Sequence, residues 1–490
     1  MDNIVFLQFI IPLVWAIGFF VFPWNKNKFK VYALVGSFIF FLNSLRLVYS
    51  IPAYEHINIL IQIPFPHFFG MTYTIGLDGL SSLLVILNAL LLIIVILATL
   101  DFETPKYKLY FFSIYTLIWA VNGSLLSINL FSFYIFWEAM LVPLFILVGV
   151  FGGKNRKYAS YKFFLYTAAG SILMLASMVY LSALAFKANG SYDLTADIIK
   201  SLHLPYGGFL SPQSLVFWGF CVAFFIKVPV FPFHSWLPDA HVEAPTAGSI
   251  VLAGVLLKLG IYGLLRFVIP VFPEAVLANQ DIVMFLGVSG IIYGAITALA
   301  QTDIKKIVAY SSISHMGYIV VGIFSLNEQA LAGAVFQMVA HGLTTGGLFV
   351  AVNCLYSRRH TKEVSEYGGI AKVMPLFAVV FFIMILGSMA VPLTNGFVGE
   401  FLIILGVYKT SKIFGALSAV GVILGPLYLL TMFQNVMLGE IKNKENESLK
   451  DLNWVELTPF IILAVIIIFH GVYPNSVLLM VQNMLKGLAL

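Results

Sequence analysis

Two lysines lie inside apolar runs of this sequence, where a positive charge is costly. Lys227 ends the run LVFWGFCVAFFIK, and Lys258 lies in the middle of GSIVLAGVLLKLGIYGLLRF. A charge at the centre of a bilayer costs roughly 2.5–3.5 kcal/mol, so such residues usually mark a path for ions or protons. Proton exchange between buried groups is the chemistry that these lysines predict.

Acids and imidazoles complete this set of ionisable residues. Glu138 lies deep in LFSFYIFWEAMLVPLFILVGV, and Glu400 lies in GSMAVPLTNGFVGEFLIIL. His341 is central in AGAVFQMVAHGLTTGGLFVAV, His315 lies in a serine-rich patch, and His234 lies in a proline-rich link. An imidazole gives and takes protons near neutral pH. We therefore interpret the whole set, with both lysines, as a proton relay bridged by water.

One pair within this set is predicted to be direct. An opposite charge within about 4–6 Å favours both charged forms, so we expect Glu138 to pair with Lys227. Structural roles remain open: this pair could simply join two helices, Lys258 could reach an interface, and the histidines could link helices. His315 and His341 could also be axial haem ligands, although the neighbouring serines and lysines disfavour that interpretation.

Two proline interruptions position the relay. Pro229 follows Lys227 directly, and Pro392 interrupts a second apolar run close to Glu400. Proline lacks a backbone donor and clashes with the preceding turn, so a helix should break at each site. Broken helices at membrane depth occur where the freed backbone meets protein or water, and transporters build ion sites there. The two breaks predict an internal repeat around a central pathway.

The composition is that of a polytopic membrane protein. Hydrophobic residues make up 60% of the 490 residues and charged residues 10%. About 20 apolar residues cross a bilayer, and we count fourteen spans if each broken helix counts once. The N-terminus lacks the features of a cleaved signal peptide and is expected to be a retained first span. The predicted spans are 4–22, 30–49, 78–100, 109–127, 129–150, 162–186, 213–229 with a broken continuation, 246–268, 282–300, 304–324, 330–355, 373–392 with a continuation, 412–437 and 455–473.

Basic residues predict the orientation. Eighteen of the 27 Lys and Arg residues lie in alternate links or beside them, and only six lie in the other links and the C-terminal tail. The positive-inside rule then places the basic links in the cytoplasm and both termini outside. The net charge of +5 is thus a topology signal, and no nucleic-acid partner is predicted.

Other kinds of chemistry find little support in the sequence. The two cysteines, Cys221 and Cys354, are too few for an iron–sulfur cluster, which needs about four thiolates. We find no hydrolytic triad, phosphate-binding loop or metal-ligand cluster, and we expect no cofactor or metal to bind this chain.

Three long motifs resemble a known family. FPFHSWLPDAHVEAPTAGSIVLAGVLLKLGIYGLLRF, AQTDIKKIVAYSSISHMGYI and LFSFYIFWEAMLVPLFILVGVFGG look like the antiporter-like membrane subunits of respiratory complex I, the NADH-quinone oxidoreductase. Within that family the resemblance is to the subunit M group, the counterpart of mitochondrial chain 4. The related L and N groups usually have lysine at the position of Glu400.

The resemblance implies an all-α fold of about fourteen transmembrane helices in one membrane domain. It implies two inverted five-helix repeats, with helices seven and twelve discontinuous; we divide the chain into three first helices (1–108), two repeats (109–268 and 282–437) and a last helix (455–473). It assigns the proton-channel positions to Glu138, Lys227, Lys258, His341 and Glu400, with His315 as an accessory relay.

The resemblance also implies a function as a subunit of a proton-translocating enzyme complex. Electrons would pass from NADH through FMN and iron–sulfur clusters to quinone in other subunits, and this chain would hold no redox centre. The expected partners are the lipid bilayer, protons and other membrane-arm subunits, including L-type and N-type ones, in an energy-transducing membrane such as the bacterial inner membrane. The alternatives are a subunit of a multisubunit cation/proton antiporter or of a membrane-bound hydrogenase, a solute permease, and an inert scaffold.

Overall fold

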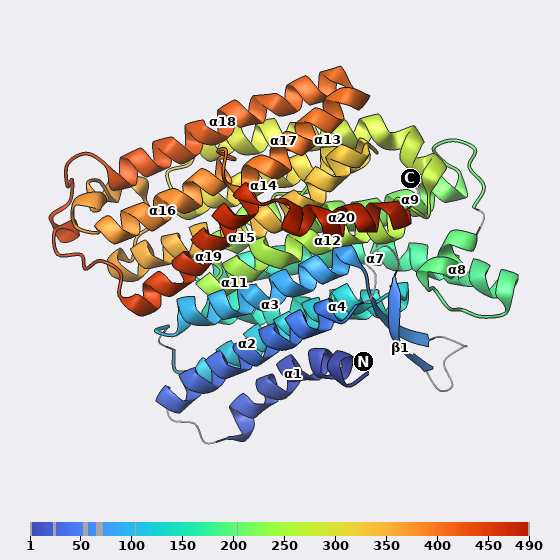
Figure 1. The fold of residues 1–490 in the computed structure, drawn as a ribbon, viewed down its shortest axis with the longest axis horizontal. Coiled ribbons are helices and arrows are strands. Elements are labelled where there is room, and N and C mark those ends of the chain that lie inside the picture. The colour runs from blue at the N-terminus through green and yellow to red at the C-terminus, as the bar shows by residue number, and fades with distance from the viewer. Residues whose placement is uncertain are drawn as a thin grey trace.

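Long helices that run side by side make up nearly all of the structure (Figure 1). The computed structural model describes residues 2–22, 26–51, 57–64, 72–102, 104–202 and 204–488. Within these residues, twelve helices are long and apolar enough to cross a membrane, and two shorter apolar helices accompany them. The chain is therefore a multi-pass membrane protein, as predicted. The helices that form the bundle are α1 (Asp2–Val21), α2 (Lys26–Tyr49), α3 (Gly79–Thr99), α4 (Tyr107–Leu126), α5 (Leu130–Ala139), α6 (Leu141–Phe151), α7 (Arg156–Asn189), α9 (Pro212–Lys227), α11 (Thr246–Val251), α12 (Leu257–Gly263), α13 (Pro273–Leu299), α14 (Ile304–Phe324), α15 (Glu328–Arg359), α16 (Pro375–Ser388), α17 (Asn395–Thr410), α18 (Lys412–Met437) and α19 (Trp454–Val472).

Both predicted helix breaks are present. The first short helix, α9, ends at Lys227, and the chain becomes helical again only in α10 (Trp236–Glu243). The second, α16, ends at Ser388, and α17 begins at Asn395. Each break thus places an ionisable residue of the predicted relay on a helix that ends or begins inside the bundle.

Several boundaries differ from the prediction. α13 begins at Pro273 and not at 282, because proline suits a first helical turn. The polar residues that suggested a later start are accommodated inside the helix: Asn279 is buried and donates to the Ala275 carbonyl at 2.8 Å. The predicted span 129–150 is interrupted at Met140, which separates α5 from α6.

A β-hairpin was missed by the sequence analysis. Strands β1 (Asn58–Pro64) and β2 (Thr72–Leu77) pair antiparallel. The hairpin lies at the right-hand end of the bundle in Figure 1, together with α8 (Ala196–Ser201) and the marks for both chain ends. The chain ends in α20 (Asn475–Leu488), which packs on α3 and α15.

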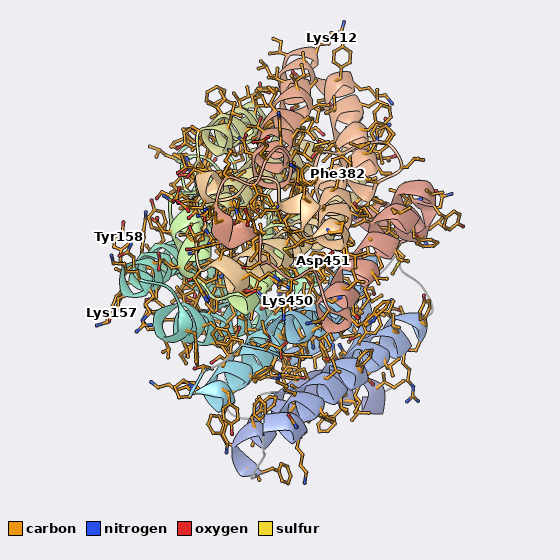
Figure 2. All side chains as sticks on the ribbon, turned by 90° about the vertical axis from the view of Figure 1, so that its left-hand side faces the viewer. Lys157, Tyr158, Phe382, Lys412, Lys450 and Asp451 are labelled. Atoms are coloured by element: carbon orange, nitrogen blue, oxygen red, sulfur yellow. The ribbon has the colours of Figure 1, made fainter. Side chains whose placement is uncertain are left out.

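The basic links gather at the opposite end. One cavity of about 610 Å³ is lined there by Asp101, Gly153, Lys305, Lys362 and Glu456, which come from five different basic links or the helix ends beside them. Figure 2 views this end, where Lys157 and Lys450 are labelled. The grouping of basic links at one end agrees with the predicted alternation; we call this the basic end.

Glycines bring α15 and α17 into close contact. A Cβ atom on Gly333 of α15 would lie 2.7 Å from the Ile403 backbone nitrogen of α17, and one on Gly399 would lie 2.3 Å from Gln337 Oε1. Only residues without a side chain allow such an approach. The close packing sets α15, which carries His341, directly beside α17, which carries Glu400.

Candidate proton relay

Lys258 lies in a helix that is irregular on both sides. Two π-helical segments, η1 (Leu252–Leu256) and η2 (Leu264–Val268), flank the short α12. Wide π turns interrupt the regular ladder of helix hydrogen bonds and are frequent at functional sites. Here the Ala253 carbonyl accepts a hydrogen bond from Lys258 Nζ, and the lysine is fully buried. The helix itself therefore supplies part of the solvation that the buried amine needs.

The second partner of this lysine is an imidazole on another helix. Lys258 Nζ lies 2.7 Å from His341 Nδ1, and both side chains are buried. Proton transfer needs heavy atoms about 2.6–3.2 Å apart, or one intervening water. This pair meets that requirement directly.

A second imidazole–acid pair lies beside the first. His315 Nδ1 lies 2.9 Å from Glu400 Oε1, and each side chain is only 7% exposed. Gln337 Nε2 also donates to Glu400 Oε1, at 3.1 Å, and Ser388 Oγ lies 3.3 Å from His315 Nε2. The carboxyl group is thus held by an imidazole and an amide.

The two pairs meet through their imidazole rings. The ring centroids of His315 and His341 are 5.5 Å apart. Lys258, His341, His315 and Glu400 therefore form one buried row that crosses four elements; we call it the relay row. An amine, two imidazoles and a carboxylate in this order can pass a proton in either direction, with water needed only between the rings.

The predicted pairing of Glu138 with Lys227 is not a direct hydrogen bond in this structure, although Glu138 lies within electrostatic range of the amine. Lys227 Nζ has no hydrogen-bond partner among the described residues; it lies over the Trp137 ring, 4.7 Å from its centroid, and 5.9 Å from that of Phe163. Glu138 Oε1 is also unpartnered, and its side chain is only partly buried. Successive positions on an α-helix are about 100° apart. Trp137 therefore contacts the amine directly, and its neighbour Glu138 acts on it only from a longer distance.

His234 stands apart from the relay row. Its ring packs in one cluster with the rings of Phe231 and Tyr293, whose centroids are 5.6 and 4.9 Å away, and its Nδ1 has no partner in the described part of the chain. The serine hydroxyls next to His315 on α14 donate to helix carbonyls and not to its ring.

The structure adds residues that the sequence analysis did not name. Gln337 precedes His341 by one turn of α15, and Ser388 ends α16. Uncharged polar residues in helices usually bond to their own backbone, so their types carried no signal. Spacing is the only available signal: Gln337 lies four residues from a predicted relay histidine and therefore on the same face.

No metal site accompanies the row. Among the described residues, no group of three or more His, Cys, Asp or Glu side chains could hold a metal ion. The relay chemistry needs only proton exchange between the side chains already named.

Comparisons with known proteins decide the family. A model of the family described as "NADH:quinone oxidoreductase/Mrp antiporter, TM" matches residues 127–425. NADH-quinone oxidoreductase subunit M of Rickettsia typhi is 40% identical over 495 residues, covering 98% of each chain. The chain belongs to the NADH-quinone oxidoreductase subunit M family. The residues of the relay row, and Glu138 and Lys227 as well, all lie within the matched segment.

A further relative and a solved structure agree. NADH-ubiquinone oxidoreductase chain 4 of Marchantia polymorpha is 37% identical, covering 95% of this chain and 93% of its own. A chain in the structure of respiratory complex I from Thermus thermophilus with bound NADH superposes with a TM-score of 0.88 at 31% identity, covering 99% and 98% of the two chains. The fold is thus the antiporter-like fold of complex I.

Proposed function

We propose that this chain is a proton-translocating membrane-arm subunit of an NADH-quinone oxidoreductase. Electron transfer from NADH to quinone in other subunits would drive protons along the relay row. We propose that Glu138, Lys227 and His234 also carry protons, although they lie outside the relay row. The full-length similarity to subunit M and chain 4 supports the assignment to the complex.

The observation that carries the mechanism is the relay row itself. Each of its four residues is at most 6% exposed, and two of the three contacts between them are direct hydrogen bonds. A hydrophobic side chain at each position would hold the helices at lower desolvation cost. Titratable groups kept in contact at such depth favour a proton path over a purely structural role.

Finer features belong to the same proposal. We infer fourteen spans, since α9 with α10 and α16 with α17 would each count as one broken crossing beside the twelve long helices. We also propose two inverted repeats, a cytoplasmic location for the basic end, L-type and N-type neighbours, and no redox cofactor in this chain. The repeats would place each broken helix at the same point of its half.

The main rival is a subunit of a multisubunit cation/proton antiporter, because the family description includes the Mrp antiporter. The two functions differ in their energy source. Proton pumping that depends on NADH and quinone supports the proposal, whereas proton movement that follows only an imposed sodium gradient would support the rival.

The test replaces Lys258 by Met in the assembled complex. The matched control is Lys409→Met, which removes the same charge at the exposed end of α17, where Lys409 bonds to Gln329. We expect K258M to lower NADH-driven proton pumping in membrane vesicles by at least about a hundredfold, the usual range for a lost proton-transfer group, and K409M to pump normally. Normal pumping by an assembled K258M complex would refute the relay.

A further inference from the structure

Two lysines share one wall of the cavity at the basic end. Lys305 Nζ donates to the Ala244 carbonyl at 2.6 Å, and Lys362 Nζ donates to the Val242 carbonyl at the same distance. Both carbonyls lie at the C-terminal end of α10, where lysine side chains commonly satisfy the last free carbonyls of a helix. The two ammonium groups also lie within electrostatic range of each other, so their like charges repel.

Neither lysine is paired with a carboxylate in the described part of the chain, although Lys305 is only 7% exposed. Two acids act on Lys305 from a longer distance: Asp303 caps its own helix, and Glu243 accepts from the Asn155 backbone N–H at 2.8 Å. An ammonium group has three donors, and each lysine uses one of them on a carbonyl. A buried charge without a counter-ion is costly, so the unused donors point to an anion that the chain itself does not supply.

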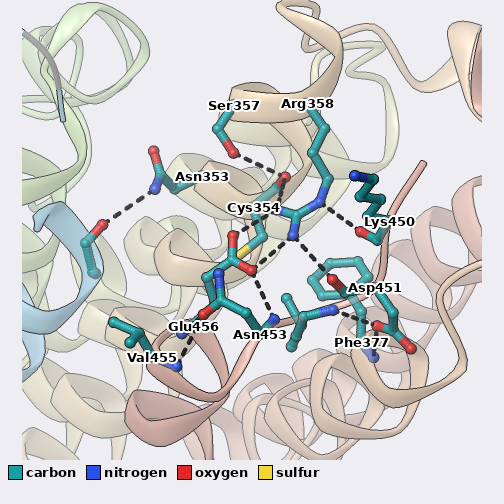
Figure 3. A network of polar contacts seen from close by, with 12 residues as sticks. Asn353, Cys354, Ser357, Arg358, Phe377, Lys450, Asp451, Asn453, Val455 and Glu456 are labelled. Atoms are coloured by element: carbon teal, nitrogen blue, oxygen red, sulfur yellow. Dashed lines mark hydrogen bonds and ion pairs between the residues drawn. The ribbon is translucent and has the colours of Figure 1, made fainter. Parts of the chain in front are cut away.

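Two further carboxylates that line the cavity already have cationic partners. Asp101 Oδ1 lies 2.7 Å from Lys30 Nζ. Arg358 donates to both oxygens of Glu456 at 2.8 Å, in the network that Figure 3 shows. Neither acid can move to the two lysines without breaking a pair of its own. An anion that enters the cavity therefore meets two lysines whose charges have no ion-pair partner among the described residues.

The cavity has the size and the lining of a ligand site. Its volume of about 610 Å³ lies within the range of small-molecule sites, roughly 300–1,000 Å³. It is open to solvent at the basic end, since the side chain of its lining residue Asp101 is 74% exposed. Apolar side chains, among them Phe102, Phe349 and Val455, line much of the remainder. A few polar groups in a mainly apolar lining are what fixes the orientation of a bound ligand.

We propose that Lys305 and Lys362 bind the phosphate group of a ligand in this cavity. A phosphomonoester carries a charge of about −1.5 to −2 near pH 7 and three acceptor oxygens, which match two ammonium groups with unused donors. A carboxylate would bring only one charge. Inorganic phosphate and the headgroup of phosphatidic acid share this chemistry, and basic pockets between membrane helices bind lipid headgroups. The site is independent of the proposed proton translocation.

Cys354 reports whether the cavity is occupied, because it lines the cavity beside the network of Figure 3. Cys221→Ala leaves it as the only cysteine of this chain. The assembled complex is placed in phosphatidylcholine nanodiscs, which leave both faces accessible, and labelling of this subunit by neutral N-ethylmaleimide is followed on gels. We expect inorganic phosphate, or phosphatidic acid added to the nanodiscs, to slow labelling about tenfold at ten times its Kd. Chloride at the same ionic strength should have no effect.

A pair of lysine variants tests the assigned residues. Lys362→Gln removes the charge and keeps an N–H donor for the Val242 carbonyl. The matched control is Lys372→Gln, which removes an exposed charge in the same link but outside the cavity lining. We expect K362Q to raise the ligand concentration for half-maximal protection at least about tenfold, the value of one lost hydrogen bond to a charged group. K372Q should be protected like the parent.

Protection by inorganic phosphate alone would assign the site to a free phosphate, and protection by phosphatidic acid alone to a lipid headgroup. The proposal is overturned if neither protects Cys354, or if K362Q and K372Q change the protection equally. Should the thiol react too slowly to follow, retention of radiolabelled phosphate and phosphatidic acid is compared with that of the Lys305→Gln/Lys362→Gln double variant, and equal retention would likewise overturn it. Neither readout involves pumping, so a negative result here leaves the relay intact.

Discussion

A buried ion pair between Asp78 and Arg266 is predicted to be the main link between the β-hairpin and the helix of Lys258. Asp78 follows β2, caps the N-terminus of α3 and accepts from the Ser81 backbone N–H at 2.9 Å. Its other oxygen lies 2.7 Å from Arg266 Nη2 in η2, and both side chains are only 8% exposed. Because little solvent reaches the pair, screening does not weaken it as it weakens surface pairs.

Replacing Asp78 by Asn removes the charge and keeps the capping oxygen. Leaving one member of a buried pair without its partner costs about 3–5 kcal/mol. Loss of the cap, about another 1 kcal/mol, is avoided by the choice of Asn over Ala. Arg266 also keeps its contact with the Tyr262 ring, 5.2 Å from the centroid, which places the expected cost near the lower limit of that range. We therefore expect a destabilisation of about 3 kcal/mol.

A buried cysteine of the chain provides the assay. Cys221 is free and fully buried, so a maleimide reaches it only when the bundle opens, whereas Cys354 lines the cavity at the basic end and is first replaced by Ser. Gel-resolved labelling of this subunit in intact membranes then reports the opening equilibrium, provided that closing is faster than labelling. A cost of about 3 kcal/mol corresponds to a labelling rate raised about a hundredfold, since every 1.4 kcal/mol is tenfold.

The double variant distinguishes pairing from local damage. Asp78→Asn combined with Arg266→Met removes both charges, and replacing a buried pair by apolar groups is often neutral. We expect the double variant to be labelled more slowly than D78N alone. The reasoning would be refuted if D78N were labelled within about twofold of the wild-type rate. It would also be refuted if the destabilisation of the double variant equalled the sum of the two single destabilisations.

Three further predictions concern the relay, a link and the helix packing. Glu400→Gln keeps the shape and should assemble normally, but it should lower NADH-driven pumping at least about a hundredfold, measured by dye quenching in vesicles; normal pumping would contradict it. Burial raises the pKa of the Asp193 carboxyl, in the link after α7, above its ordinary value of 3.8. This group should therefore contribute stability that is lost as the pH rises through the raised pKa. Thermal midpoints measured over a pH series should show this loss of stability in the wild type and not in Asp193→Asn. A Cβ on Gly317 would lie 2.6 Å from a backbone oxygen of α13, whereas a Cβ on Gly425 would have no atom within 4 Å. In the maleimide assay, Gly317→Ala should therefore lower the stability by about 1–3 kcal/mol, and Gly425→Ala should leave it nearly unchanged.

The breaks and the buried charges could be predicted from sequence because each violates a strong rule. A lysine in an apolar run and a proline inside a spanning run are rare, so Lys227, Lys258, Pro229 and Pro392 each carry a large signal. The hairpin at 58–77 carries a weak one. Its strands are six or seven residues long, and short alternating segments are inconspicuous in a chain dominated by long apolar runs.

Contacts between helices could be predicted only in part. The sequence places Lys258, His341 and Glu400 at similar depth, but their contact depends on how each helix is rotated about its axis. Glycine packing between α15 and α17 sets that rotation, and the relevant glycines look ordinary in the sequence. The same uncertainty explains why no direct bond joins Lys227 to Glu138, since a rotation of one residue, about 100°, exchanges Trp137 for Glu138 at the amine.

The two halves of the proposed pathway therefore differ in how a proton can move. From Lys258 to Glu400, two steps are already within transfer distance and the third is between adjacent rings. Lys227 rests on aromatic faces and Glu138 lacks a partner at Oε1, so a proton cannot pass between them without a moving side chain or a chain of water. A cation over a ring is held by about 1–2 kcal/mol, less than a buried carboxylate would hold it. Lys227 is thus the member of the set that a small rearrangement at the α9 break can release most easily. We therefore expect the driving signal of the proposed relay to act at Lys227, and the row from Lys258 to Glu400 to conduct.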